Sequence, residues 1–233
     1  MGLDVIIPVY NEGENIRGVL DSLGESVKTP LNILICYDND DDNTLEELKS
    51  YPRDKFRILT IKNRGTGVHG AILTGFKESC EEAVLVMPAD DTYNASIIDD
   101  MYRKFTEGND IVAASRFMPG GCMEGAPLLK NILVRCAAFT LYYIARLPVH
   151  DPSNGFRLFS RRVIDTVDIE STQGFVYSIE LLVKCHRFGW KIAEVSAKWF
   201  ERTKGKSRFR IAEWLPSYLK WYFYAFRTNF LRK

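Results

Sequence analysis

The sequence lacks the features that mark secreted and membrane-spanning proteins. Its 233 residues contain no run of about 18 or more uncharged apolar residues, and residues 1–4 do not begin a signal peptide. Five cysteines are present, an odd number with no CxxC pair among them. We therefore expect a cytosolic protein with reduced, mostly buried thiols. The cysteines are Cys36, Cys80, Cys122, Cys136 and Cys185.

A strong overall charge is also missing, because the net charge at pH 7 is only +1. We expect no nucleic-acid partner. The balance hides an asymmetry: residues 199–233 hold nine Lys or Arg against two Glu, a net charge of +7 that leaves −6 on the remainder. A basic end on a mildly acidic body favours an anionic surface or ligand near the end of the chain.

What the chain does have is a 46% content of hydrophobic residues, enough for a substantial core. Apolar runs of strand length alternate with helical stretches, which predicts βαβ units and an α/β fold with a mostly parallel central sheet flanked by helices. The expected strands are residues 3–8, 31–36, 56–61, 83–87 and 111–115, and the expected helices are residues 14–23, 44–50, 70–79 and 95–105.

Beyond Arg116 the alternation stops. Residues 119–127 contain three glycines and are expected to form a loop, and residues 150–157 form a turn rich in Asp, Pro, Asn and Gly. Residues 128–147 are apolar but interrupted by three cations, which indicates either a core helix or an amphipathic helix at an interface. A further helix is expected over residues 179–188 and a strand over residues 191–195.

The C-terminal residues predict an amphipathic aromatic and basic helix. We divide the chain into a domain over residues 1–209 and a helix within residues 210–233 that starts at Pro216, a residue favoured in the first turn. Four apolar residues share one helix face, namely Leu219, Phe223, Phe226 and Phe230. With the neighbouring cations they suit a peripheral membrane contact, and they equally suit packing on the chain's own domain or on a second subunit in a homo-oligomer.

Two acidic residues follow the fourth predicted strand, where parallel sheets bind ligands. Residues 83–87 are continuously apolar, as in a strand buried on both faces, and Asp90 and Asp91 follow Pro88. Ligands of open α/β sheets bind at the carboxyl ends of the strands. Carboxylates at that place can hold Mg²⁺ or Mn²⁺ against a diphosphate. The alternative is that one of these acids caps the following helix.

Residues 65–70 spell the dinucleotide-binding pattern GxGxxG, and Asp90 falls 20 residues beyond Gly70. The position of the pattern argues against a dinucleotide site, since that pattern usually opens the first βαβ unit and here two units precede it. We interpret these residues as a glycine-rich loop that lets the backbone come close to a ligand or a strand.

Short motifs recur in order along residues 3–209. They comprise VIIPVYNE at residues 5–12, then Asp38, Asn63, Gly67, Gly70, Ala89-Asp90, Ser115-Arg116-Phe117, Asp151-Pro152, Gly155-Phe156-Arg157, Glu180 and the basic residues 202–208. Each motif is short, but their order and spacing together are specific. In the order and the spacing of these motifs, the chain resembles the inverting family 2 glycosyltransferases, and within that family the polyprenol-phosphate sugar synthases.

The resemblance implies a GT-A fold and the transfer of a sugar from a GDP- or UDP-sugar to the phosphate of a lipid carrier at the cytoplasmic face of a membrane. It implies that the nucleotide sugar is bound by Pro8, Tyr10, Asn11, Glu12, Asp38, Asn63, Gly67, Gly70, Ala89 and Asp91. It implies catalytic roles for Asp90, Arg116 and Arg202. It implies an acceptor-phosphate site made of Lys130, Arg135, Lys204, Ser207 and Arg208.

An anionic phosphate acceptor needs no strong general base, and we assign no catalytic histidine. His69 and His150 are expected in loops or at the surface. The chain departs from the family's Asp-x-Asp motif, because Pro88 occupies the position of the first Asp. We expect Mg²⁺ or Mn²⁺ to bind through Asp90 and Thr92, with phosphate oxygens and water completing the shell. The alternatives are a non-catalytic, membrane-docked nucleotide-sugar binding protein and a nucleotide-dependent oxidoreductase.

Overall fold

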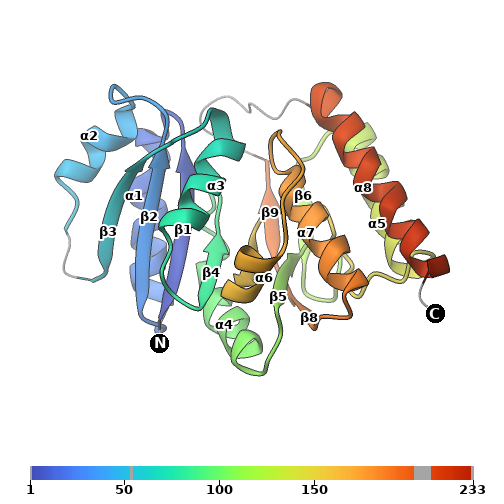
Figure 1. Cartoon of the computed structure of the whole chain (residues 1–233). Helices are drawn as coiled ribbons and strands as arrows, with labels where there is room; N and C mark the ends of the chain where they lie inside the picture. Colours follow the sequence, from blue (N-terminus) through green and yellow to red (C-terminus); the bar gives the residue numbers. More distant parts are fainter. Residues whose placement is uncertain (1, 53–54, 202–210, 232–233) are drawn as a thin grey trace.

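A seven-stranded sheet forms the centre of the molecule, with helices on both faces (Figure 1). The computed structural model describes residues 2–52, 55–201 and 211–231. The strand order is β3-β2-β1-β4-β7-β5-β8; β7 is antiparallel to its two neighbours, and the other pairs of this sheet are parallel. The strands are β1 (Leu3–Val9), β2 (Leu31–Tyr37), β3 (Arg57–Lys62), β4 (Ala83–Val86), β5 (Ile111–Ser115), β7 (Arg157–Ser160) and β8 (Ile192–Ser196). This confirms the mostly parallel α/β fold predicted from the sequence.

Two hydrophobic cores lie on opposite faces of the sheet. Alternate side chains of β1 enter different cores, with Val5 and Ile7 in one and Ile6 in the other. Burial on both faces explains why the strand sequences are apolar without alternation. The first core is covered by α1 (Gly13–Ser26), α2 (Asn43–Lys49), the short 3₁₀ turn η1 (Ala95–Ile97) and α4 (Ile98–Thr106); the second is covered by α3 (Gly67–Glu78), α6 (Arg161–Thr166) and α7 (Val176–Arg187).

Two longer helices form an outer layer over the second core. Helix α8 (Ile211–Leu231) packs on α7, and α5 (Leu128–Tyr143) lies beside α8, joined to it by a 2.8 Å hydrogen bond between the hydroxyls of Thr140 and Tyr222 (Figure 1). No helix in the described ranges is both long enough and apolar enough to cross a membrane.

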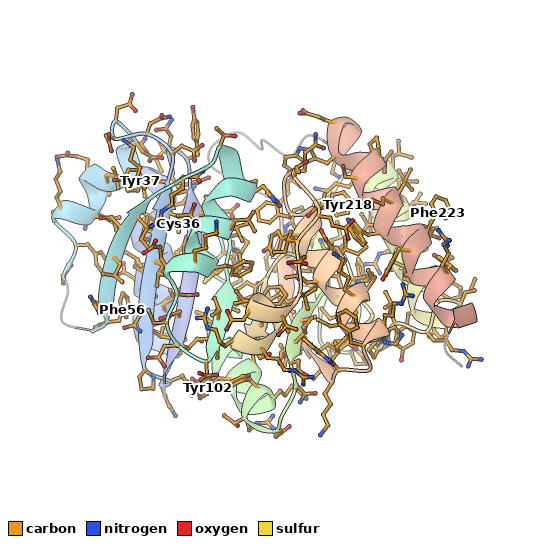
Figure 2. All side chains as sticks on the ribbon, in the orientation of Figure 1. Cys36, Tyr37, Phe56, Tyr102, Tyr218 and Phe223 are labelled. Carbon is orange, nitrogen blue, oxygen red and sulfur yellow. The ribbon has the colours of Figure 1, made fainter. Side chains whose placement is uncertain are left out.

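The prediction that the last helix starts at Pro216 is wrong, because α8 begins at Ile211 and contains Pro216. Trp214, upstream of this proline, is half-buried and packs on the second core, so tertiary contacts extend the helix past the local signal. The helix buries Trp221 and Ala225 and leaves Leu219 and Phe223 exposed. Figure 2 shows Phe223 on the outer side of α8 and Tyr218 on the side nearer α7.

Three short strands lie outside the predicted set, namely β6 (Cys122–Glu124), β7 and β9 (Lys198–Phe200). Strand β6 falls within residues 119–127, where the predicted loop is wrong, and it pairs in parallel with β9 in a separate two-stranded sheet. Strands of three or four residues are too short to show a periodic pattern. Their partners lie far away along the chain, so only the tertiary fold forms them.

The expectation of mostly buried cysteines is also wrong. Cys36 and Cys185 are buried, but Cys80 and Cys136 are exposed and Cys122 is half-buried. Burial raises the pKa of the Cys36 and Cys185 thiols to about 12. Cysteine is small and apolar, so the sequence does not indicate which of these residues face the solvent.

Candidate active site

The loops after β1 and β2 are held together by hydrogen bonds to backbone amides. The Asp42 carboxylate accepts two bonds from the Asn11 N–H, at 3.0 and 3.1 Å, and the Thr44 hydroxyl accepts a 2.9 Å bond from the Glu12 N–H. Asn11 has a φ of 53°, in the left-handed region that asparagine adopts more readily than most residues. The network fixes the predicted nucleotide-binding turn. Sequence analysis did not assign Asp42 and Thr44 to the site, although the acidic run after β2 is a signal for them.

Three more predicted residues belong to the ends of β1 and β4. Pro8 lies in β1 opposite Cys36 of β2, and Tyr10 follows it with 45% of its surface exposed. Ala89 is buried just before the half-buried Asp90. The carboxyl ends of neighbouring parallel strands therefore bring these residues to one edge of the sheet, as predicted.

Asp38, Asn63 and Gly67 meet at the start of α3. One Asp38 oxygen accepts a 2.5 Å bond from the Asn63 side chain and the other accepts a 2.9 Å bond from the Gly67 N–H. Gly67 has a φ of 64°, which favours glycine. A side chain at Gly70 would approach the Asn63 amide oxygen to 3.0 Å and the Gly65 backbone to 3.1 Å. The glycine-rich loop thus permits close packing of the backbone at this edge of the sheet.

Asp91 stabilises the turn that follows β4. Its carboxylate accepts bonds from the backbone N–H groups of Tyr93 and Asn94, both at 3.0 Å, and from the Asn94 side chain at 2.6 Å. Burial raises the pKa of Asp91, and these hydrogen bonds partly offset that effect. Asp91 therefore holds the turn before η1, and both of its oxygens already have partners. The alternative that Asp90 or Asp91 caps the following helix is wrong, because the N-cap residues of η1 and α4 are Asn94 and Ile97.

Asp90, half-buried beside Asp91, is the carboxylate at which the sequence predicts a cation. No cluster of three or more His, Cys, Asp or Glu residues suited to a metal occurs within the described part of the chain. Thr92 is exposed, and its methyl group lies 3.5 Å from the position that a side chain at Gly18 of α1 would occupy. One carboxylate with an adjacent hydroxyl is a small ligand set, which fits Mg²⁺ or Mn²⁺ only when substrate phosphates supply further oxygens.

Arg116, directly after β5, forms a buried ion pair with Asp151. Its Nε donates to one carboxylate oxygen at 2.6 Å and its Nη2 to the other at 3.0 Å, while Nη2 also donates to the Ser153 hydroxyl at 2.8 Å. Burial alone would raise the pKa of Asp151, but the Arg116 guanidinium lowers it below its ordinary value. The third nitrogen, Nη1, donates to no side chain or backbone group among the described residues, so the fork presents a fixed donor for an anion.

Two predicted acceptor-site cations approach the same region from α5. Arg116 and Arg135 both lie against the Phe117 ring, at 5.2 and 4.7 Å from its centroid, and Lys130 lies 4.9 Å from the centroid of the Trp199 ring. The structure therefore places Arg116 and Arg135 on one aromatic ring and Lys130 on another. The remaining predicted residues Arg202, Lys204, Ser207 and Arg208 lie outside the described residues.

Of the two named histidines, His150 lies in a loop as expected, and His69 does not. His69 lies in α3 with only 8% of its surface exposed, and burial lowers its pKa. His150 is half-buried, stacks on Tyr142 and bonds to the Glu194 carboxylate. His69 follows a loop in sequence but is enclosed by segments distant in the chain. Neither histidine belongs to the hydrogen-bonded groups of Asp38, Asp91 and Arg116 described above.

The family 2 glycosyl transferase model matches residues 4–168, more than half of the chain. The chain belongs to this family. It is a glycosyltransferase with the GT-A fold, so the predicted family and enzyme class are confirmed. Its C-terminal helix α8 lies beyond the matched residues.

Among its relatives, this glycosyltransferase is 27% identical over 216 residues to the dolichol-phosphate mannosyltransferase of Pyrococcus furiosus, a match that covers 90% of this chain and 60% of the relative. It is 26% identical to the polyprenol monophosphomannose synthase of Mycolicibacterium smegmatis, over 90% of this chain and 85% of that one. The chain thus spans less than two thirds of the archaeal relative.

Solved structures agree on the fold. Glucosyl-3-phosphoglycerate synthase from Mycobacterium tuberculosis, determined with Mn²⁺ and UDP, superimposes with a TM-score of 0.68 at 15% identity, covering 97% of this chain and 79% of that one. TarS from Staphylococcus aureus gives a TM-score of 0.62 at 18% identity, over 85% and 60% of the two chains.

Proposed function

We propose that this glycosyltransferase moves a sugar, with inversion, from a nucleotide sugar to the phosphate of a polyprenol-type lipid. The observation that carries the proposal is the Arg116 fork, which buried Asp151 holds in place and which shares the Phe117 ring with Arg135 of α5. Within residues 2–52, 55–201 and 211–231, its Nη1 donates to no other group. Arginine forks match phosphate oxygens. The names of both relatives combine mannose with a dolichol or polyprenol phosphate.

The nucleotide-sugar donor would bind at the same edge of the central sheet, at the carboxyl ends of β1, β2 and β3. The turn of Pro8, Tyr10, Asn11 and Glu12 and the Asp38–Asn63–Gly67 group would face the nucleotide of a GDP- or UDP-sugar, with Gly70 and Ala89 allowing close approach. The hydrogen bonds that fix these loops support a preformed site. Asp91 would contribute by holding the turn next to Asp90.

Asp90 would hold Mg²⁺ or Mn²⁺, with Thr92 beside it and the donor diphosphate completing the shell, since Mg²⁺ is commonly bound through one or two carboxylates plus substrate phosphates. When bound, the ion would neutralise charge on the departing diphosphate. The likeness to a synthase determined with Mn²⁺ and UDP supports this assignment.

The residues of the chain would act mainly by binding and orienting charge. An acceptor phosphate oxygen attacks the anomeric carbon, the bond from that carbon to the diphosphate oxygen breaks, and the nucleoside diphosphate leaves with the electron pair. Arg116, Arg135 and Lys130 would orient the acceptor phosphate, and Arg202, Lys204, Ser207 and Arg208 would add cations to the two phosphate groups. The nucleophile is already an anion, so no side chain needs to remove a proton.

Helices α5 and α8 together form a surface suited to lipid. Ten large apolar side chains on or next to these helices are exposed, and they are Leu128, Leu129, Ile132, Leu133, Phe139, Tyr143, Ile144, Leu215, Leu219 and Phe223. Helix α5 contains cations but no acidic residue. A basic apolar surface matches an anionic bilayer better than it matches a second copy carrying the same charge. Residues 210–233 and α5 would therefore hold the enzyme peripherally at the cytoplasmic face of the membrane, with the lipid phosphate near Arg116.

A transfer assay tests this function. The full chain is incubated with radiolabelled GDP- and UDP-sugars and a polyprenyl phosphate in detergent, with and without Mn²⁺. We expect label in the lipid extract with one donor class, and less when Mn²⁺ is chelated. Donor binding by calorimetry without any transfer to the lipid would overturn the proposed acceptor.

A further inference from the structure

Arg157, the first residue of β7, is a fully buried cation without a carboxylate partner. Its exposed fraction is 0%, and no ion pair to it occurs among the described residues. Its Nη1 donates to the Ser178 carbonyl, its Nη2 to the Pro152 carbonyl at 3.3 Å, and its Nε has no hydrogen-bond partner. A buried charge of this kind costs several kcal/mol unless it is compensated. The fold therefore keeps, at this position, a charge whose burial destabilises the folded state.

The position of Arg157 lies between the two strands that lead to the active site. Because β7 is antiparallel, its first residue meets Val86 at the end of β4 and Ala113 near the end of β5. Asp90 lies in the loop after β4, and Arg116 directly follows β5. Arg157 thus lies beneath the edge where the phosphate groups would gather.

Arg157 and Arg116 also form hydrogen bonds to the same turn, residues 151–153. Arg116 binds the Asp151 carboxylate and the Ser153 hydroxyl, and Arg157 binds the carbonyl of Pro152 between them. The three charges of Arg116, Asp151 and Arg157 sum to +1 in a buried cluster. Burial lowers the pKa of Arg157 to about 10, so it remains charged at neutral pH. Charges in a poorly screened interior act over longer distances than charges in water.

We propose that Arg157 is a positioning residue that acts through the Asp151 turn and Arg116, giving the phosphate site its net positive charge. This deepens the proposed function, since phosphate is common to both of its substrates. Two substitutions separate the effect of the Arg157 charge from the effect of its hydrogen bonds. Arg157→Lys keeps the charge but loses the fork, whereas Arg157→Gln keeps an amide donor for the carbonyls but loses the charge.

The test is thermal unfolding of the full chain in increasing inorganic phosphate at constant ionic strength, because a ligand that binds the folded state raises the melting temperature. We expect the apparent phosphate affinity to fall on the order of tenfold in Arg157→Gln, the effect of one charge about 12 Å away through an effective dielectric constant of about 20. The affinity of Arg157→Lys should stay within about threefold of the wild type, a difference well below that of one close charge.

Arg161 provides a matched control at the opposite end of β7. Its guanidinium binds the Glu81 carbonyl at 2.9 Å and the Ser79 hydroxyl at 3.0 Å, so it performs a similar structural task away from the site. Arg161→Gln should lower the melting temperature without changing the phosphate response. The proposal is overturned if Arg157→Gln responds like the wild type, if Arg157→Lys loses as much affinity as Arg157→Gln, or if the wild type gives no response. A normal phosphate response in a chain without transfer activity would instead refute only the proposed function.

Discussion

Asn94 and Lys198 exchange two hydrogen bonds across a separation of 104 residues. The Asn94 side-chain amide donates to the Lys198 carbonyl at 2.7 Å, and the Lys198 N–H donates back to the Asn94 side-chain oxygen at 2.8 Å. Asn94 is buried and also binds Asp91. The turn that carries Asp90 is therefore fastened to β9, which pairs with β6.

Replacing Asn94 by Ala should destabilise the fold by about 2–3 kcal/mol, because the Lys198 N–H and carbonyl lose their partner and Asp91 loses one of its three donors. Urea unfolding measures this change. The exposed neighbour Ser96 is the control, and Ser96→Ala should stay within about 0.5 kcal/mol of the wild type. Equal stability of the two variants would show that the link between the turn and β9 does not stabilise the fold.

Asp90 and Asp91 should respond differently to substitution. Asp90→Asn should remove Mn²⁺-dependent donor binding in calorimetry while leaving the melting temperature nearly unchanged. Asp91→Ala should lower the melting temperature, because three donors of its own turn lose their acceptor. Unchanged donor affinity in Asp90→Asn places the cation site elsewhere.

The Arg116–Asp151 pair should make stability depend on acid pH. Its folded-state pKa is lowered, so Asp151 contributes stability that is present above the unfolded pKa and is lost as pH falls through the folded pKa. The window therefore lies below about pH 4. Asp151→Asn should cost about 3–5 kcal/mol at neutral pH by leaving Arg116 unpaired, and should lose less stability than the wild type on further acidification. Parallel pH profiles of the two melting temperatures would contradict this account.

Arg202 is assigned only by the family resemblance, since it lies outside the described residues. We expect Arg202→Ala to reduce turnover at least about 100-fold, the scale on which a group that stabilises transition-state charge acts. The melting temperature should not change. A variant with wild-type turnover would remove Arg202 from the catalytic group.

Binding to lipid should depend on the outer faces of α5 and α8. Leu133→Asp with Phe223→Asp should abolish flotation with vesicles that contain anionic lipid, and binding of the wild type should weaken as salt rises. Phe188→Asp is the control, because Phe188 is 55% exposed at the end of α7. Removing α8 entirely is a poorer test, since it would uncover the contacts of buried Trp221. If the double variant instead only converts a dimer to a monomer, the surface binds a second copy.

The sequence by itself determined the strands and the parallel sheet of the first half of the chain. Continuous apolar runs separated by helices predict a parallel sheet, and the ends of its strands converge on one edge. Asp38, Asn63 and Gly67 were grouped by the family resemblance, and the structure bonds them to one another. Local patterns suffice there because each unit forms with its neighbour in the chain.

Only the tertiary structure decided the arrangement of Arg116, Asp151 and Arg157 and the buried face of α8. Asp151 reaches Arg116 across 35 residues, and Arg157 enters the sheet on a four-residue strand with no periodic signal. The aromatic residues of α8 surround the whole helix, so its sequence allows several faces to be buried. The shape of α7 selects Trp221 and Ala225, because close packing rewards the face that fits the neighbouring helix.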